Sequence, residues 1–135
     1  MKKVISMVVL VVMLFSCLTV NSFAAAPETV MPLWDNTSLT SINMVFGETT
    51  GAALMRVTGK SGVNQIDGYC IVYVRDGNDW VYVTELSKTV YRFTCYLEVP
   101  FYCEVGCEYK ADFTFQVHKN GVIETIEQSV TKICT

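Results

Sequence analysis

The chain of 135 residues has little charge and few of the residues that usually build catalytic or nucleic-acid-binding sites. Charged residues make up 17% of it, and His118 is its single histidine. Ten basic residues face 13 acidic ones, so the chain lacks the basic excess that attracts nucleic acid or anionic lipid. Hydrophobic residues reach 51%, which excludes a disordered chain and predicts one folded domain.

The first 26 residues have the pattern of an export signal. Lys2 and Lys3 precede an apolar run over residues 4–20, and small residues follow at 22 and 24–26. We interpret residues 1–24 as a secretory signal peptide, which predicts a secreted, extracellular protein that meets the membrane only during export. Its removal leaves eight basic and 13 acidic side chains, a net charge of −5.

Two alternatives stay open for this segment. The apolar run is close to the minimum of about 17 residues for a retained membrane anchor. Residues 14–17 also resemble a bacterial lipoprotein cleavage box, in which Cys17 would carry the lipid.

The remaining chain consists of short β-branched and aromatic runs separated by turn residues. It predicts an extended segment at 25–36 and an all-β domain at 37–135. Strands are expected at 39–46, 52–58, 65–75, 80–85, 91–99 and 107–118, and from residue 122 onward. This number of strands favours a two-sheet antiparallel sandwich of immunoglobulin-like type, with a small β-barrel as the alternative.

Turn residues predict which strands are neighbours. The segments 76–79 and 120–121 each predict a hairpin, the second because Asn-Gly suits the positive φ angles of a type I′ turn. The strands at 39–46 and 52–58 are expected to form another. Pro100 is expected to end the strand that precedes it.

Alternation predicts which faces are buried. In 65–75, Ile66 and the even-numbered residues 70–74 are expected to point inward, and the odd-numbered residues 67–75 outward. In 91–99 and 107–118 the odd-numbered residues are expected to be buried. Trp80, at the start of its strand, is expected in the core.

Five cysteines follow the signal, and export makes disulfides plausible. A two-residue turn at 120–121 places Cys107 opposite Cys134, and we predict a bridge between them; a bulge would shift this register. An unpaired cysteine, Cys70 or Cys103, could then link two chains into a dimer. Cys103 and Cys107 have a metal-like spacing, but no second close pair follows, so no metal site is expected.

Residues 106–109 resemble the tyrosine corner of immunoglobulin-like sandwiches, with Tyr109 as the tyrosine. Ala111 stands where those domains have a cysteine, so their inter-sheet disulfide is not expected.

Short motifs also resemble a family of small secreted β-sandwich proteins of clostridial-type Gram-positive bacteria. They are Met31-Pro32-Leu33-Trp34, the segment 57–62, the hairpin ending in Trp80, Gly106 with Tyr109, and the segment 131–135. The resemblance implies a secreted β-sandwich and supplies no activity or catalytic residue.

Residue types that could do chemistry are isolated. His118 is expected to be a solvated surface residue, and no G-x-S-x-G signature accompanies it. The carboxylate pairs Glu104/Glu108 and Glu124/Glu127 could serve glycoside hydrolysis, but on strands they are usually the wet face. The acidic 76–79 segment lacks the distal glutamate of a calcium loop. We therefore expect no enzyme activity and no cofactor.

Exposed aromatic side chains are the remaining candidates for function. Tyr69, Tyr73, Tyr82 and Tyr96 are expected to face outward, and Phe101 and Tyr102 to lie in a loop after Pro100. Flat aromatic rings stack on sugars or fill protein interfaces. The sequence thus predicts a non-catalytic domain that binds a glycan, a cell-envelope component or a protein, or alternatively an assembly protein linked through a cysteine.

Overall fold

The computed structural model describes residues 34–135, and the predicted signal peptide lies outside the described residues. Seven strands follow one another along this part of the chain. They are β1 (Thr37–Phe46), β2 (Thr50–Gly59), β3 (Val63–Asp76), β4 (Asp79–Val90), β5 (Thr94–Tyr102), β6 (Glu108–Lys119) and β7 (Val122–Ile133). Within these residues there is no helix of the length and hydrophobicity that a membrane crossing needs.

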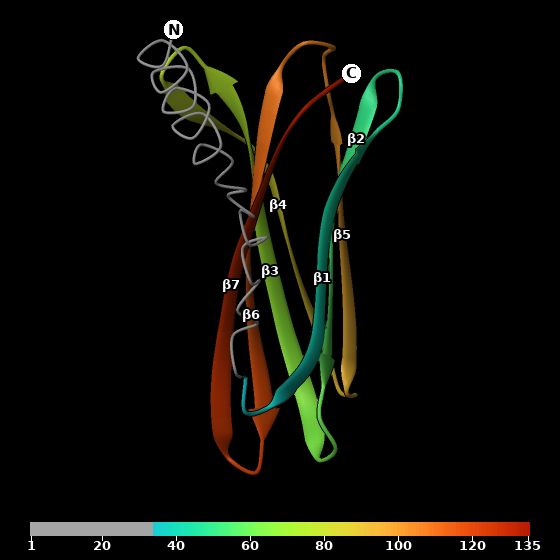
Figure 1. Cartoon of the computed structure of the whole chain (residues 1–135), viewed down its shortest axis with the longest axis vertical. Helices are drawn as coiled ribbons and strands as arrows, with labels where there is room; N and C mark the ends of the chain where they lie inside the picture. Colours follow the sequence, from blue (N-terminus) through green and yellow to red (C-terminus); the bar gives the residue numbers. More distant parts are fainter. Residues whose placement is uncertain (1–33) are drawn as a thin grey trace, which may run out of the picture. The chain divides into compact units, whose positions relative to one another are not determined.

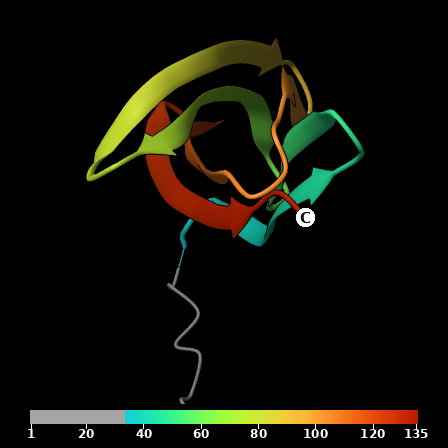
Figure 2. The ribbon, with the colours of Figure 1, turned by 90° about the horizontal axis from the view of Figure 1, so that it is seen from above.

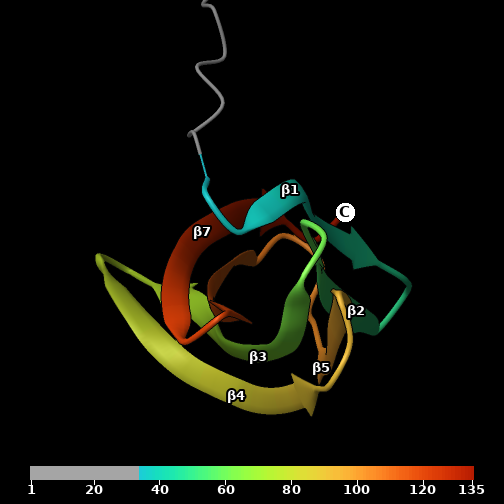
Figure 3. The same ribbon diagram turned by 90° about the horizontal axis from the view of Figure 1, so that it is seen from below.

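The strands form two antiparallel sheets, which confirms the predicted sandwich. Sheet A has the order β1-β2-β5 and sheet B the order β4-β3-β6-β7 (Figure 1). Viewed from below, β4 of sheet B curves alongside β5 of sheet A, and β7 lies near β1 (Figure 3). The view from above shows the strands around a common interior (Figure 2). Hydrogen bonding does not continue from one sheet into the other, so the barrel alternative is wrong.

The predicted hairpins are confirmed. β1 pairs with β2, and Asp76 pairs with Asp79 across the turn between β3 and β4. Asn120 and Gly121 have φ angles of 52° and 80°, as a type I′ turn requires. The fourth strand is longer than expected, since β4 continues to Val90.

The register between β3 and β6 depends on a close contact in the core. Gly68 of β3 pairs with Phe115 of β6, and both are buried. A Cβ atom on Gly68 would lie 2.6 Å from the Phe115 ring. The strand therefore needs a glycine at the place where this ring crosses it.

The strand predicted at 91–99 differs from β5 at both ends. Tyr91 and Phe93 were expected to be buried but lie in the connection from β4, 81% and 60% exposed. Pro100 does not end the strand, and it pairs with Ala52 of β2. β5 is an edge strand, which can accommodate a residue without an N–H donor. Its two last residues continue the alternation, so Phe101 is buried while Tyr102 is exposed.

The chain just before β1 is fixed by Glu124 of β7. The Glu124 carboxylate accepts hydrogen bonds from the N–H groups of Asp35 and Asn36 and from the Thr37 hydroxyl, at 2.5, 3.2 and 2.7 Å. The Asn36 amide donates to the Val117 carbonyl at 3.2 Å. The end of the segment that we predicted to be merely extended is therefore part of the folded domain.

The predicted tyrosine corner is present. The hydroxyl of Tyr109 accepts a hydrogen bond from the backbone N–H of Glu104, at 3.0 Å. This bond holds the β5–β6 connection against the start of β6. Ala111 is buried at the position where immunoglobulin-like sandwiches have a cysteine.

Gly68→Ala is expected to lower the free energy of unfolding by about 1–3 kcal/mol, because the new methyl group would overlap a buried ring. Urea denaturation followed by tryptophan fluorescence measures the change. Gly47→Ala is the matched control, since a Cβ there would meet its nearest neighbour at 3.4 Å, an ordinary contact. Equal stability of Gly68→Ala and the wild type would contradict this account of the register.

Candidate functional site

The outer surface of sheet B carries four aromatic side chains, which we call the aromatic face: Tyr69, Tyr73, Trp80 and Tyr82. Tyr69 and Tyr73 point outward from β3 because they alternate with the buried Cys70 and Val72. Tyr82 lies directly opposite Tyr73 in the β3–β4 pair. Three of the predicted binding residues thus share one face.

Trp80 is a correction to the sequence analysis, which placed it in the core. It pairs with Arg75, whose side chain points outward, so Trp80 belongs to the same outer surface and is only half-buried. The Arg75 guanidinium carbon lies 5.1 Å from the centre of its ring. The Lys110 ammonium lies 4.9 Å from the Tyr73 ring and 5.3 Å from the Trp80 ring. These cations hold one end of the aromatic face in place.

Tyr69 is fixed by a carboxylate. Its hydroxyl donates to Glu85 of β4 at 2.5 Å, and this hydrogen bond raises the pKa of Tyr69 to about 12. The tyrosine therefore stays a neutral donor at every physiological pH. Its side chain remains 37% exposed, so the ring has a defined orientation and is accessible to a ligand.

A shallow pocket of about 320 Å³ adjoins Tyr69 on the same surface. Its other lining residues are Asp67, Gly68, Ser87, Lys88, Thr89, Thr114 and Gln116. Among residues 34–135, no hydrogen bond engages the side chains of Ser87, Thr114 or Gln116. These hydroxyl and amide groups are free to pair with a polar ligand next to the tyrosine ring.

Asp67, which lines this pocket, contacts three neighbouring side chains. Its carboxylate accepts hydrogen bonds from Thr89 at 2.6 Å and from Gln65 at 2.9 Å, and it contacts the His118 ring at 2.7 Å. Burial by itself would raise the pKa of Asp67, but these hydrogen bonds outweigh it and lower the pKa below 3.8. The carboxylate is therefore ionised, and its partners are held in fixed positions.

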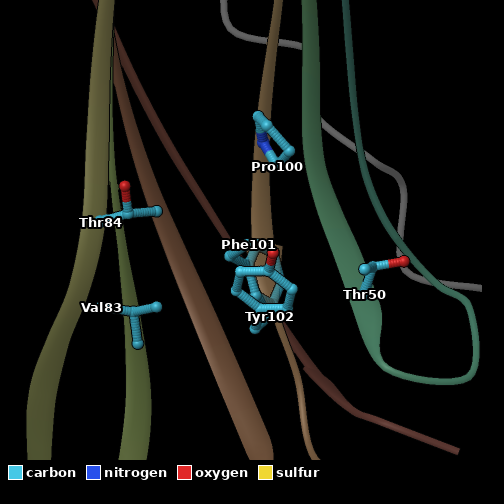
Figure 4. A pocket seen from close by; sticks show the side chains of 6 residues that line it. All are labelled: Thr50, Val83, Thr84, Pro100, Phe101 and Tyr102. Atoms are coloured by element: carbon cyan, nitrogen blue, oxygen red, sulfur yellow. The ribbon is translucent and has the colours of Figure 1, made fainter.

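The other predicted binding residues lie elsewhere. Tyr96 is on the outer surface of sheet A, opposite Arg56. Phe101 and Tyr102 line a groove of about 530 Å³ where β4 and β5 approach each other (Figure 4). We expected both in a loop, but they are strand residues. Val83 and Thr84 both line this groove because the register of β3 and β4 shifts at Tyr73.

The cysteines are arranged differently from the predicted bridge. The register is as expected, since Glu108 pairs with Ile133 and the Cys134 N–H donates to the Cys107 carbonyl at 2.9 Å. The Cys134 sulfur, however, lies 3.1 Å from the Cys103 sulfur. Gly106, with a φ of 89°, donates to the Cys134 carbonyl, so two residues of the connection lie opposite Cys134. This is a local bulge, and the sulfur that contacts Cys134 belongs to Cys103 rather than Cys107.

The carboxylate pair Glu124 and Glu127, considered for catalysis, is split between the two faces of β7. Glu124 binds the start of β1, and it faces inward on β7, where it pairs with Val117. Glu127 pairs with Thr114 on the outer face. These two carboxylates therefore cannot act together. Within residues 34–135, no cluster of three or more histidine, cysteine or acidic side chains could hold a metal ion.

The chain has a weak structural likeness to a known protein but no match in sequence. No family model matches the chain. No curated protein matches it either. Among solved structures, the sporulation control protein Spo0M from Bacillus subtilis resembles it with a TM-score of 0.34 and 10% sequence identity. The match covers 72% of this chain and 49% of that one, so the chain spans about half the length of Spo0M. The resemblance to clostridial-type secreted proteins stays a prediction.

Asp67→Asn is expected to lower the free energy of unfolding at pH 7 by about 1–2 kcal/mol, because the amide cannot replace the charge-assisted hydrogen bonds. The pKa of Asp67 is lower in the folded state, so its stabilising effect is present above about pH 4 and disappears as the pH falls through the folded-state value. Urea denaturation at pH 7 and at about pH 3 measures both effects. Glu98→Gln, an exposed carboxylate on β5, is the control, and an equal loss at both pH values would contradict the assignment.

Proposed function

We propose that this chain is a secreted, non-catalytic domain that binds a glycan on the outer surface of sheet B. The observation that supports this most directly is the position of Tyr69 beside the polar pocket. Its ring is held by Glu85 at 2.5 Å, and hydroxyl and amide groups of β4 and β6 surround it. Sugars offer both an apolar face for an aromatic ring and a ring of hydroxyl groups for such partners.

A glycan suits this surface better than a protein partner. The centre of a protein interface is depleted of charged side chains. Here Asp67, Glu85 and Lys110 lie among the aromatic residues, and each already has a partner within the domain. A ligand that brings hydroxyl groups can bind beside these pairs without separating them. The remaining aromatic residues, Tyr73, Trp80 and Tyr82, extend the surface beyond the pocket, which suits an extended chain of sugars.

The test compares retention on peptidoglycan and on a panel of polysaccharides for two double variants of the chain from residue 25 onward. Tyr69→Ala/Tyr82→Ala removes two rings of the aromatic face, and the apparent affinity is expected to fall at least tenfold, which corresponds to about 1.4 kcal/mol. Tyr96→Ala/Tyr102→Ala is the control, because it removes two exposed tyrosines outside that face.

The control variant is expected to bind like the wild type. All four tyrosines are exposed, between 37% and 83%, so the two variants should fold equally well. Equal retention of both variants, or retention of none of the three proteins, would contradict a glycan site on the aromatic face.

The second candidate function is an assembly in which a disulfide links two chains. We predicted Cys70 or Cys103 for this link, but both are buried. Cys70 is 0% exposed and Cys103 is 5% exposed. Neither sulfur can therefore reach a second folded chain to form a bridge. Among the cysteines in the described part of the chain, Cys107 is the one that is only half-buried. This candidate predicts a dimer on non-reducing gels that reductant or Cys107→Ser removes; a dimer that persists in Cys107→Ser would contradict it.

A further inference from the structure

We infer that Cys103 and Cys134 form a disulfide that joins the two sheets when the chain folds under oxidising conditions. Cys103 follows directly after β5 of sheet A, and Cys134 follows β7 of sheet B. Their sulfur atoms are 3.1 Å apart, in contact without a bond. A disulfide bond is about 2.05 Å long, so a shift of about an ångström closes it.

The backbone around both cysteines keeps their sulfurs together. The Cys134 N–H donates to Cys107 at 2.9 Å, and its carbonyl accepts from Gly106 at 2.8 Å. The Cys103 N–H donates to the carbonyl of Thr49, in the β1–β2 turn, at 3.0 Å. The backbone of Cys134 is thus bonded to the residues just before β6 of sheet B. The backbone of Cys103 is bonded to the β1–β2 turn of sheet A.

The reaction is thiol–disulfide exchange with a low-molecular-weight disulfide such as oxidised glutathione. One cysteine, as the thiolate, attacks the glutathione disulfide, which gives a mixed disulfide and releases one glutathione. The second cysteine attacks the protein sulfur of that mixed disulfide, so the Cys103–Cys134 bond forms and the second glutathione leaves. Two protein thiols are oxidised and one glutathione disulfide is reduced to two thiols.

The bridge is expected to form during folding rather than afterwards. Cys103 and Cys134 are 5% and 0% exposed in the folded domain, so an external disulfide reaches them poorly. Burial, together with the hydrogen bond to Cys134, also raises the pKa of the Cys103 thiol to about 11, and the attacking thiolate is then scarce. In the unfolded chain neither restriction applies. Once formed, the buried bond is protected from reductants by the same packing.

The experiment refolds the protein from denaturant in a glutathione redox buffer and, in parallel, with excess reductant. Free thiols are alkylated under denaturing conditions, and peptides are mapped by mass spectrometry after cleavage at Glu104, which separates Cys103 from Cys107. We expect two fewer free thiols in the oxidised sample and a cross-linked peptide that contains Cys103 and Cys134. The melting temperature should rise by roughly 10 °C on oxidation, since the bond closes a loop of about 30 residues.

Two variants distinguish the cysteines. Cys107→Ser is expected to retain the bridge and the increase in melting temperature, whereas Cys134→Ser is expected to lose both. The mapping of the wild type does not depend on either variant folding. A wild-type bridge between Cys107 and Cys134, or an oxidised wild type with no internal bridge, would overturn the inference. The glycan-binding proposal is unaffected by either result, because the aromatic face lies on the other side of sheet B.

Discussion

The contact between Gly68 and Phe115 determines how the rest of sheet B is arranged. A β-strand that slips by one residue exchanges its two faces. In the observed register the Phe115 ring lies over a glycine, where a Cβ would come within 2.6 Å. A slip by one residue would place either Tyr69 or Asp67 against that ring in the core. The close approach therefore fixes β3 relative to β6 and also directs Tyr69 and Tyr73 outward.

The β3–β4 hairpin extends this constraint to the neighbouring strand. Its two-residue turn places Trp80 opposite Arg75 and Tyr82 opposite Tyr73, so all four side chains share the outer surface. On the other side of β3, Lys110 of β6 lies opposite Tyr73. Its ammonium group contacts the rings of Tyr73 and Trp80. The candidate site is therefore a consequence of register, and no loop contributes to it. Side chains on paired strands are positioned more precisely than side chains on loops.

Much of the fold could be predicted from the sequence, because alternation and turn residues are local signals. The inward and outward faces of β3 and β6, the Asn120-Gly121 turn and the tyrosine corner all follow from residues close together in the chain. The position of Trp80 could have been predicted too. A two-residue turn at 77–78 pairs it with Arg75, which alternation had already placed outward, whereas its hydrophobicity alone favoured the core.

The errors arose where the outcome depends on strands that are distant in sequence. Pro100 ends a strand only if both sides of that strand are paired, and sequence does not reveal that β5 is an edge. The cysteine contact also depends on a strand that is distant in sequence. The predicted register of β6 and β7 is correct, yet Cys134 contacts Cys103, because the bulge at Gly106 and the end of β5 bring a third cysteine to the same place.

The proposed disulfide and the proposed glycan site lie on opposite sides of sheet B. Inward-facing residues form the core, and the Cys103–Cys134 contact lies on that side. Outward-facing residues of the same strands form the aromatic face and line the pocket beside Tyr69. Because neighbouring residues on a strand face opposite sides, a covalent link between the sheets can stabilise the domain without occupying the aromatic face. If the domain is secreted and binds a glycan as proposed, such a link would stabilise the fold outside the cell while the shallow pocket stays accessible.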